Sequence, residues 1–105
     1  MTAKRPPKHL SRESKNLWRT ITYEYELDNA GMLLLKVMLE SYDRLMQART
    51  ELKHDGIVYE TPSGYKKAHP ALSIEKDARS GFLQAWRQLN LDIEPPGSIG
   101  RPPGS

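Results

Sequence analysis

The sequence contains no cysteine, which excludes a disulfide framework, a catalytic thiolate and a zinc–thiolate site. It has no apolar run near the roughly 20 residues of a membrane helix, and its first residues lack the apolar segment of a secretory signal. Gly56, Gly64 and Gly81 stand apart, so no phosphate-binding loop is present, and the three histidines are also far apart. We therefore expect a cytoplasmic, non-enzymatic protein without a cofactor or a metal.

Charge is distributed unevenly along the 105 residues, although the formal net charge is only +3. Residues 1–19 carry six cations and one anion. Residues 20–65 carry four cations and eight anions, and residues 66–105 carry six cations and four anions. A chain of this length is expected to form one domain with a small core. Its basic charge is therefore concentrated at the N-terminus, ahead of an acidic middle.

Apolar spacing of three to four residues predicts two helices in the first half of the chain. The first covers about 12–25, with Ser11 as its N-cap. The second begins after Asp28 or Asn29 and reaches about Lys53, where a glycine follows shortly.

The second half of the chain predicts a β-hairpin and a third helix. Thr61-Pro62-Ser63-Gly64 suits a type I turn between two short strands, which gives a hairpin at about 57–67. Pro70 is tolerated at the first position of a helix, and the apolar stripe that follows runs to about Leu89. The expected fold is mainly α: a helix, a long helix, a small β-hairpin and a closing helix, with the last two helices antiparallel.

Three regions follow from these patterns. Residues 1–10 are basic and interrupted by Pro6-Pro7, which predicts a flexible arm. Residues 11–91 form the helical core domain. Residues 92–105 are rich in proline and glycine without periodicity, which predicts a disordered tail.

The first half of the long helix is apolar on almost every side. From Met32 to Leu39 every residue except Lys36 is apolar, so the helix must be buried on several sides. Two short neighbouring helices would cover it poorly, whereas a second copy of the chain would cover it well. This pattern predicts a homo-oligomer. The expected interface residues are Met32, Leu33, Leu34, Leu35, Val37, Met38, Leu39 and Tyr42.

The N-terminal cations are the strongest candidates for binding nucleic acid. Arg12, Lys15 and Arg19 share a helix face, and phosphate contacts need only accessible cations. The predicted DNA-binding residues are Lys4, Arg5, Lys8, His9, Arg12, Lys15 and Arg19, with Lys66 and Lys67 as secondary candidates. The alternatives remain open: the arm aids solubility alone, and the two hairpin lysines protect a strand edge from aggregation. A helix-turn-helix is disfavoured, because the second helix begins with apolar residues where base-reading side chains would stand.

A series of short segments between about residues 6 and 97 stands in an order that resembles one protein family. The segments are Pro6-Pro7-Lys8-His9-Leu10-Ser11, Trp18, Tyr25-Glu26-Leu27, Tyr42-Asp43-Arg44, Gly56, Thr61-Pro62-Ser63-Gly64, His69-Pro70-Ala71, Asp77-Ala78-Arg79, Leu89-Asn90-Leu91-Asp92 and Pro95-Pro96. Together they resemble the small terminase subunits of tailed phages and prophages. No single segment is diagnostic, and the resemblance lies in their joint order.

The resemblance implies a ring-forming, non-catalytic protein in the cytoplasm of an infected or lysogenic bacterium. Such a protein recognises a packaging-start region on double-stranded viral DNA and recruits the large subunit, which holds the ATPase and the nuclease. Two other functions are consistent with the residues alone. One is a DNA-binding regulator of another kind, and the other is a protein-interaction adaptor without DNA contact.

Overall fold

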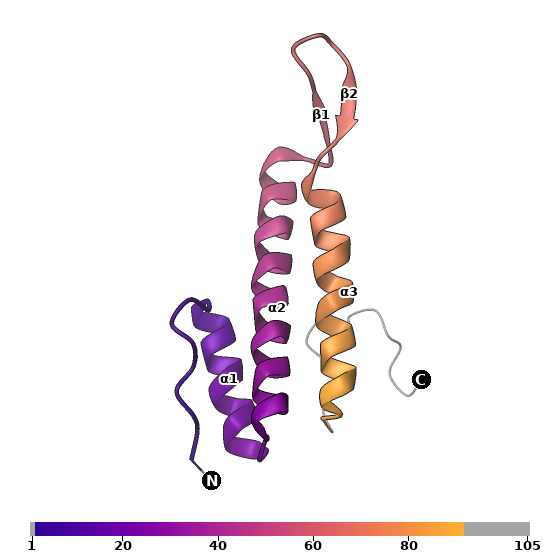
Figure 1. The fold of residues 1–105 in the computed structure, drawn as a ribbon. Helices are drawn as coiled ribbons and strands as arrows, with labels where there is room; N and C mark the ends of the chain where they lie inside the picture. Colours follow the sequence, from indigo (N-terminus) through magenta and orange to yellow (C-terminus); the bar gives the residue numbers. More distant parts are fainter. Residues whose placement is uncertain (1, 92–105) are drawn as a thin grey trace, which may run out of the picture.

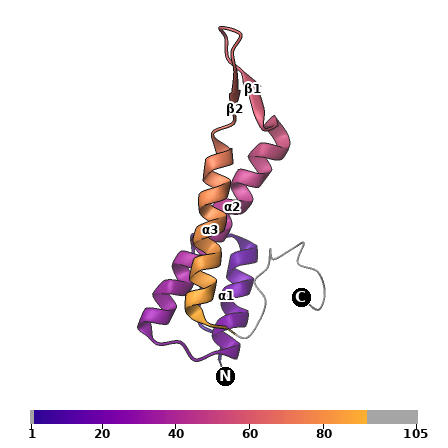
Figure 2. The ribbon, with the colours of Figure 1, turned by 90° about the vertical axis from the view of Figure 1, so that its right-hand side faces the viewer.

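The computed structural model describes residues 2–91, which form three helices and one β-hairpin. The elements are, in chain order, α1 (Arg12–Glu24), α2 (Asn29–Asp55), β1 (Val58–Glu60), β2 (Lys66–Ala68) and α3 (Ala71–Leu89). α2 and α3 lie antiparallel and side by side, and α1 lies beside the N-terminal half of α2 (Figure 1). The hairpin extends beyond the helices at the opposite end, as the side view also shows (Figure 2). The predicted mainly helical fold and its order of elements are confirmed.

The first two helices begin and end at the residues that the sequence offers as caps. Ser11 accepts a hydrogen bond from the N–H of Ser14 at 3.1 Å, which satisfies a free donor of the first turn of α1. Asp28, and not Asn29, caps α2, because its carboxylate accepts an N–H of the first turn at 2.7 Å. α2 ends at Gly56, whose φ of 83° and ψ of 163° form a combination that essentially only glycine adopts.

The hairpin between α2 and α3 has short strands and a tight turn. Its antiparallel register pairs Val58 with Ala68 and Glu60 with Lys66. The N–H of Gly64 donates to the carbonyl of Thr61 at 2.9 Å, so the predicted turn over these four residues is present. All six strand residues are exposed, and the hairpin therefore adds no buried surface to the core.

His69 joins the hairpin to the two long helices. Its Nδ1 accepts the N–H of Ala71 at 2.9 Å, so its Nε2 carries the proton and donates to Asp55 at 2.9 Å. The backbone N–H of His69 donates to the backbone carbonyl of Ile57 at 2.8 Å. Hydrogen bonds from His54 and then His69 hold the pKa of Asp55 below its usual value. The end of α2, the base of the hairpin and the start of α3 are thus fixed to one another.

The core lies at the end of the molecule where all three helices meet. Phe82 on α3 stands between two other rings, with centroids 5.3 Å from Tyr42 and 5.7 Å from Trp86. Trp18 of α1 and Trp86 of α3 are both buried in this core. The core cluster comprises Leu10, Trp18, Ile21, Leu35, Met38, Leu39, Tyr42, Phe82, Ala85 and Trp86.

Nearer the hairpin, α2 and α3 pack as a pair through smaller side chains. Ala48, Ala71 and Ala78 are buried there with Leu45. Alanine brings two helix backbones close together, but it buries far less apolar area than the leucines and aromatic residues of the core. Within residues 2–91 no helix has the length and apolar character needed to cross a membrane.

The eight predicted interface residues divide into three groups. Leu35, Met38, Leu39 and Tyr42 are buried within the single chain and belong to its own core, so they offer no surface to a second copy. The prediction underestimated the cover that α1 and α3 provide from two sides. Met32 and Leu34 are half-buried against the same core. Only Leu33, at 65% exposed, and Val37, at 53%, remain open to a neighbour.

Candidate nucleic-acid interface

The cations of α1 lie on one side of the helix. At about 100° per residue, Arg12, Lys15 and Arg19 fall within about 60° of one another around the helix axis. Arg12 and Arg19 are exposed and Lys15 is half-buried, whereas Trp18 and Ile21 face the core. α1 therefore has an apolar inner face and a cationic outer face.

Asp43 on α2 holds the N-terminus of α1 in place. Its carboxylate accepts the N–H of Ser11 at 2.8 Å, the hydroxyl of Ser11 at 2.5 Å and the hydroxyl of Ser14 at 2.6 Å. Ser14 is fully buried, so this carboxylate supplies a partner for a hydroxyl that water does not reach. A negative charge at the start of a helix also interacts favourably with the helix dipole. The position of the cationic face is thus fixed from α2.

Glu13, the acidic residue in the first turn of α1, is engaged by a tyrosine of α2. The Tyr42 hydroxyl donates to Glu13 Oε1 at 2.6 Å. Burial, together with this hydrogen bond, raises the pKa of Tyr42 to about 12. Around the helix axis, Glu13 lies about 100° or more from Arg12, Lys15 and Arg19. This anion therefore faces α2 and not the cationic side.

The N-terminal arm lies along α1 and adds its cations to those of the helix (Figure 1). The N–H of Lys4 donates to Thr22 Oγ1 at 3.0 Å, and Leu10 at the other end of the arm is buried in the core. Arg5 and Lys8 are exposed between these two attachments. Across the described chain no ion pair joins the lysines and arginines of the arm and α1 to a carboxylate, and the His9 ring is hydrogen-bonded to Glu40 Oε2 at 2.7 Å.

The structure brings the predicted DNA-binding residues together in part. Lys4, Arg5 and Lys8 belong to an arm that runs along α1, the helix that carries the other three cations. His9 is turned toward α2, where its ring supports the arm. Lys66 and Lys67 are exposed on the hairpin at the other end of the molecule, so the secondary candidates form no common site with the first set.

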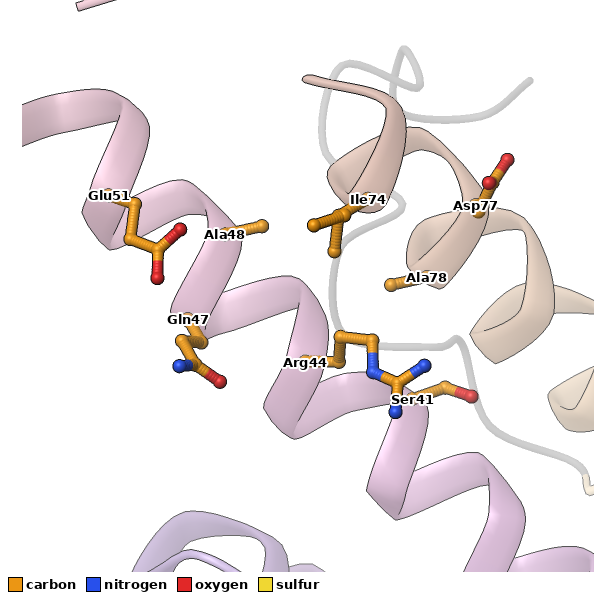
Figure 3. Close-up of a pocket in the computed structure, with 8 residues that line it drawn as sticks. All are labelled: Ser41, Arg44, Gln47, Ala48, Glu51, Ile74, Asp77 and Ala78. Carbon is orange, nitrogen blue, oxygen red and sulfur yellow. The ribbon is translucent and has the colours of Figure 1, made fainter. Parts of the chain in front are cut away.

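A groove between α2 and α3 was not foreseen from the sequence. It has a volume of about 410 Å³ and a floor of Ala48 and Ala78, and Figure 3 shows these two side chains and Ile74 facing one another across it. Its rim is polar and consists of Ser41, Arg44, Gln47, Glu51 and Asp77. The signal for it was the small side chains at facing positions of two antiparallel helices. Among residues 2–91, no cluster of histidine and carboxylate side chains has the composition of a metal site.

Comparison with known proteins identifies the family. The family model described as phage terminase, small subunit, matches residues 13–102. No curated protein and no solved structure matches the chain. Because the family match covers more than half of the sequence, the chain belongs to the phage terminase small subunits, generally non-catalytic proteins with a role in phage DNA packaging.

Proposed function

We propose that this protein binds double-stranded phage DNA through the cationic side of α1 and the arm beside it. In this proposal the protein acts as a homo-oligomer in the bacterial cytoplasm and has no catalytic activity of its own. It marks the DNA for packaging and recruits the large terminase subunit, which carries the ATPase and the nuclease. The DNA-contacting residues are Lys4, Arg5, Lys8, Arg12, Lys15 and Arg19.

The observation that carries the proposal is the pairing of two cationic segments on one side of the molecule. The arm is tied to α1 through the Lys4 N–H, so its side chains are held beside a rigid helix and need less ordering on binding. None of these six cations is neutralised by an ion pair within residues 2–91. Each phosphate contact they make releases counterions, which gives affinity without base reading.

A single copy of this surface is expected to bind DNA weakly. Its six cations amount to a small number of phosphate contacts, and non-specific contacts of this kind are sensitive to salt. An oligomer that presents several copies to one duplex raises the apparent affinity by linking weak sites. The proposed DNA binding therefore depends on self-association.

The test compares two triple-alanine variants with the same change in charge. Arg12→Ala, Lys15→Ala and Arg19→Ala remove the cations of the α1 face. Lys53→Ala, Lys76→Ala and Arg87→Ala serve as the matched control, because all three of these side chains are exposed elsewhere on the molecule.

Fluorescence anisotropy with labelled duplex DNA is measured at several salt concentrations. We expect the α1 variant to lose affinity and to lower the slope of log K against log salt by about 0.9 for each lost contact per chain, while the control retains both. Equal effects from the two variants would place the site elsewhere. Wild-type chain that binds no duplex even at low salt would favour the adaptor function.

A further inference from the structure

The hairpin carries exposed aromatic and apolar side chains that contribute nothing to the core of its own chain. Tyr65 is 71% exposed and Ile57 is 59% exposed. The hairpin extends past the ends of α2 and α3 (Figures 1 and 2), and within the described chain no other element covers it. Grouped apolar side chains left in water mark an interaction surface.

One face of the hairpin carries most of these side chains. Tyr59 stands directly opposite Lys67 in the register, so both point to the same side. Backbone hydrogen bonds continue the pairing one residue beyond each strand, which places Ile57 and Tyr65 on that side as well. We call these four residues the hairpin face: it is aromatic and apolar, and it carries one cation. Glu60 lies on the opposite side.

The surface of complementary character is the groove between α2 and α3 together with the helix surface that leads into it. Along α2, Leu33, Val37 and Ser41 follow one another at intervals of four residues, so they lie on one side of the helix. The exposed side chains of Leu33 and Val37 therefore lead to Ser41, which lines the groove. Ile74, at 43% exposed, stands on the α3 side of the same groove. We call Leu33, Val37, Ile74, Glu51 and Asp77 the groove face.

We propose that the hairpin face of one chain docks onto the groove face of a second copy. The aromatic side chains cover the alanine floor of the groove and contact Ile74, and Lys67 stands opposite the carboxylates of Glu51 and Asp77, which outnumber the one cation of the groove, Arg44. Tyrosines in pockets of this kind are typical anchors of protein interfaces. The hairpin cannot fold back onto its own groove, because it points away along the helix axis and His69 fixes its base to Asp55.

The contact is head-to-tail, since the two faces are different surfaces of one molecule. Repetition of such a contact builds a ring when the rotation between neighbours closes, and an open filament when it does not. In a closed assembly every chain uses both faces. The proposal rests on the proposed homo-oligomer, but it is independent of DNA binding, because the six DNA-contacting cations belong to neither face.

Two variants, each lacking one face, test the contact. The hairpin variant carries Ile57→Ser and Tyr65→Ser, and the groove variant carries Val37→Arg and Ile74→Arg. All four side chains are exposed, so both variants are expected to keep the circular dichroism spectrum of the wild type. The molar mass of each is measured by light scattering coupled to size exclusion, and by native mass spectrometry.

We expect the wild-type chain to assemble beyond a dimer and each variant alone to be a monomer. An equimolar mixture is expected to form a one-to-one heterodimer and nothing larger, since each partner retains one intact face. A mixture that stays monomeric, variants that assemble normally or a monomeric wild type would each overturn the inference.

A charge exchange gives a second, independent measurement. Lys67→Glu is expected to weaken assembly, and Asp77→Lys in the same chain is expected to restore it, because the exchanged pair attracts again in every contact. Absence of rescue would overturn the assigned pairing. If the heterodimer forms but the wild-type assembly binds no duplex DNA, the proposed function fails and the docking inference stands.

Discussion

Replacement of Tyr42 by phenylalanine removes one hydroxyl from the contact between α1 and α2. That hydroxyl donates to Glu13 at 2.6 Å, and burial with this bond raises the pKa of Tyr42 from 10.0 to about 12. A shift of about two pK units corresponds to about 2.7 kcal/mol in favour of the protonated side chain in the folded state. Because the folded pKa is the higher one, this contribution is complete below pH 10 and is lost as the pH rises toward 12.

Two consequences follow for the variant Tyr42→Phe. Near neutral pH we expect the free energy of unfolding to fall by about 1 to 2 kcal/mol, since a hydrogen bond to a carboxylate is lost while the ring contact with Phe82 is kept. Between about pH 8 and pH 11 we expect the wild type to lose about 1.4 kcal/mol more than the variant, because only its unfolded chain gains the ionisation of residue 42.

The assay is urea unfolding of both chains, followed by circular dichroism at a series of pH values. All other titrating groups are common to the two proteins, so their contributions cancel in the difference. Glu13→Gln provides a second comparison, because it removes the negative charge that holds the Tyr42 proton. A difference between wild type and Tyr42→Phe that stays constant from pH 8 to pH 11 would refute the reasoning.

Three further substitutions test how the helices are held. Asp43→Ala should lower the free energy of unfolding by about 2 kcal/mol, since it removes charged hydrogen bonds, and a double-mutant cycle with Ser14→Ala should give a coupling above about 0.5 kcal/mol. Gly56→Ala should cost about 1 to 3 kcal/mol in denaturant unfolding, because its backbone conformation is one that essentially only glycine adopts. Gly81→Ala should be neutral or stabilise by up to about 1 kcal/mol, because the added methyl group meets Ser41 Oγ at 3.5 Å and alanine favours helix. A thermal melt in which Gly81→Ala is the more damaging glycine substitution would contradict both expectations.

The elements of the fold were predictable because their signals are local. Ser11, Asp28 and Gly56 mark helix ends through hydrogen bonds or backbone angles that involve only their near neighbours. The turn at Thr61 and Gly64 follows from residue preferences within four positions. Signals of this range are present in the sequence itself.

The arrangement of the elements was less predictable because it depends on contacts between distant residues. The bonds from Ser14 to Asp43 and from Tyr42 to Glu13 each join positions 29 apart, and nothing in the local pattern selects these partners. The same limit explains the interface prediction. An apolar run reveals that Leu35 and Leu39 are buried, but not whether a neighbouring helix or a second chain buries them.

The confinement of the aromatic and leucine-rich core to one end gives the molecule an uneven resistance to opening. The half of the α2–α3 pair nearer the hairpin is packed mainly through alanines. Hydrogen exchange of its backbone amides should therefore be governed by fraying that starts at the hairpin. Such fraying is expected to stop near Phe82, where side chains of α1 join those of α2 and α3 in the core. Opening that begins at the hairpin is therefore expected to leave the arm and α1 folded against α2.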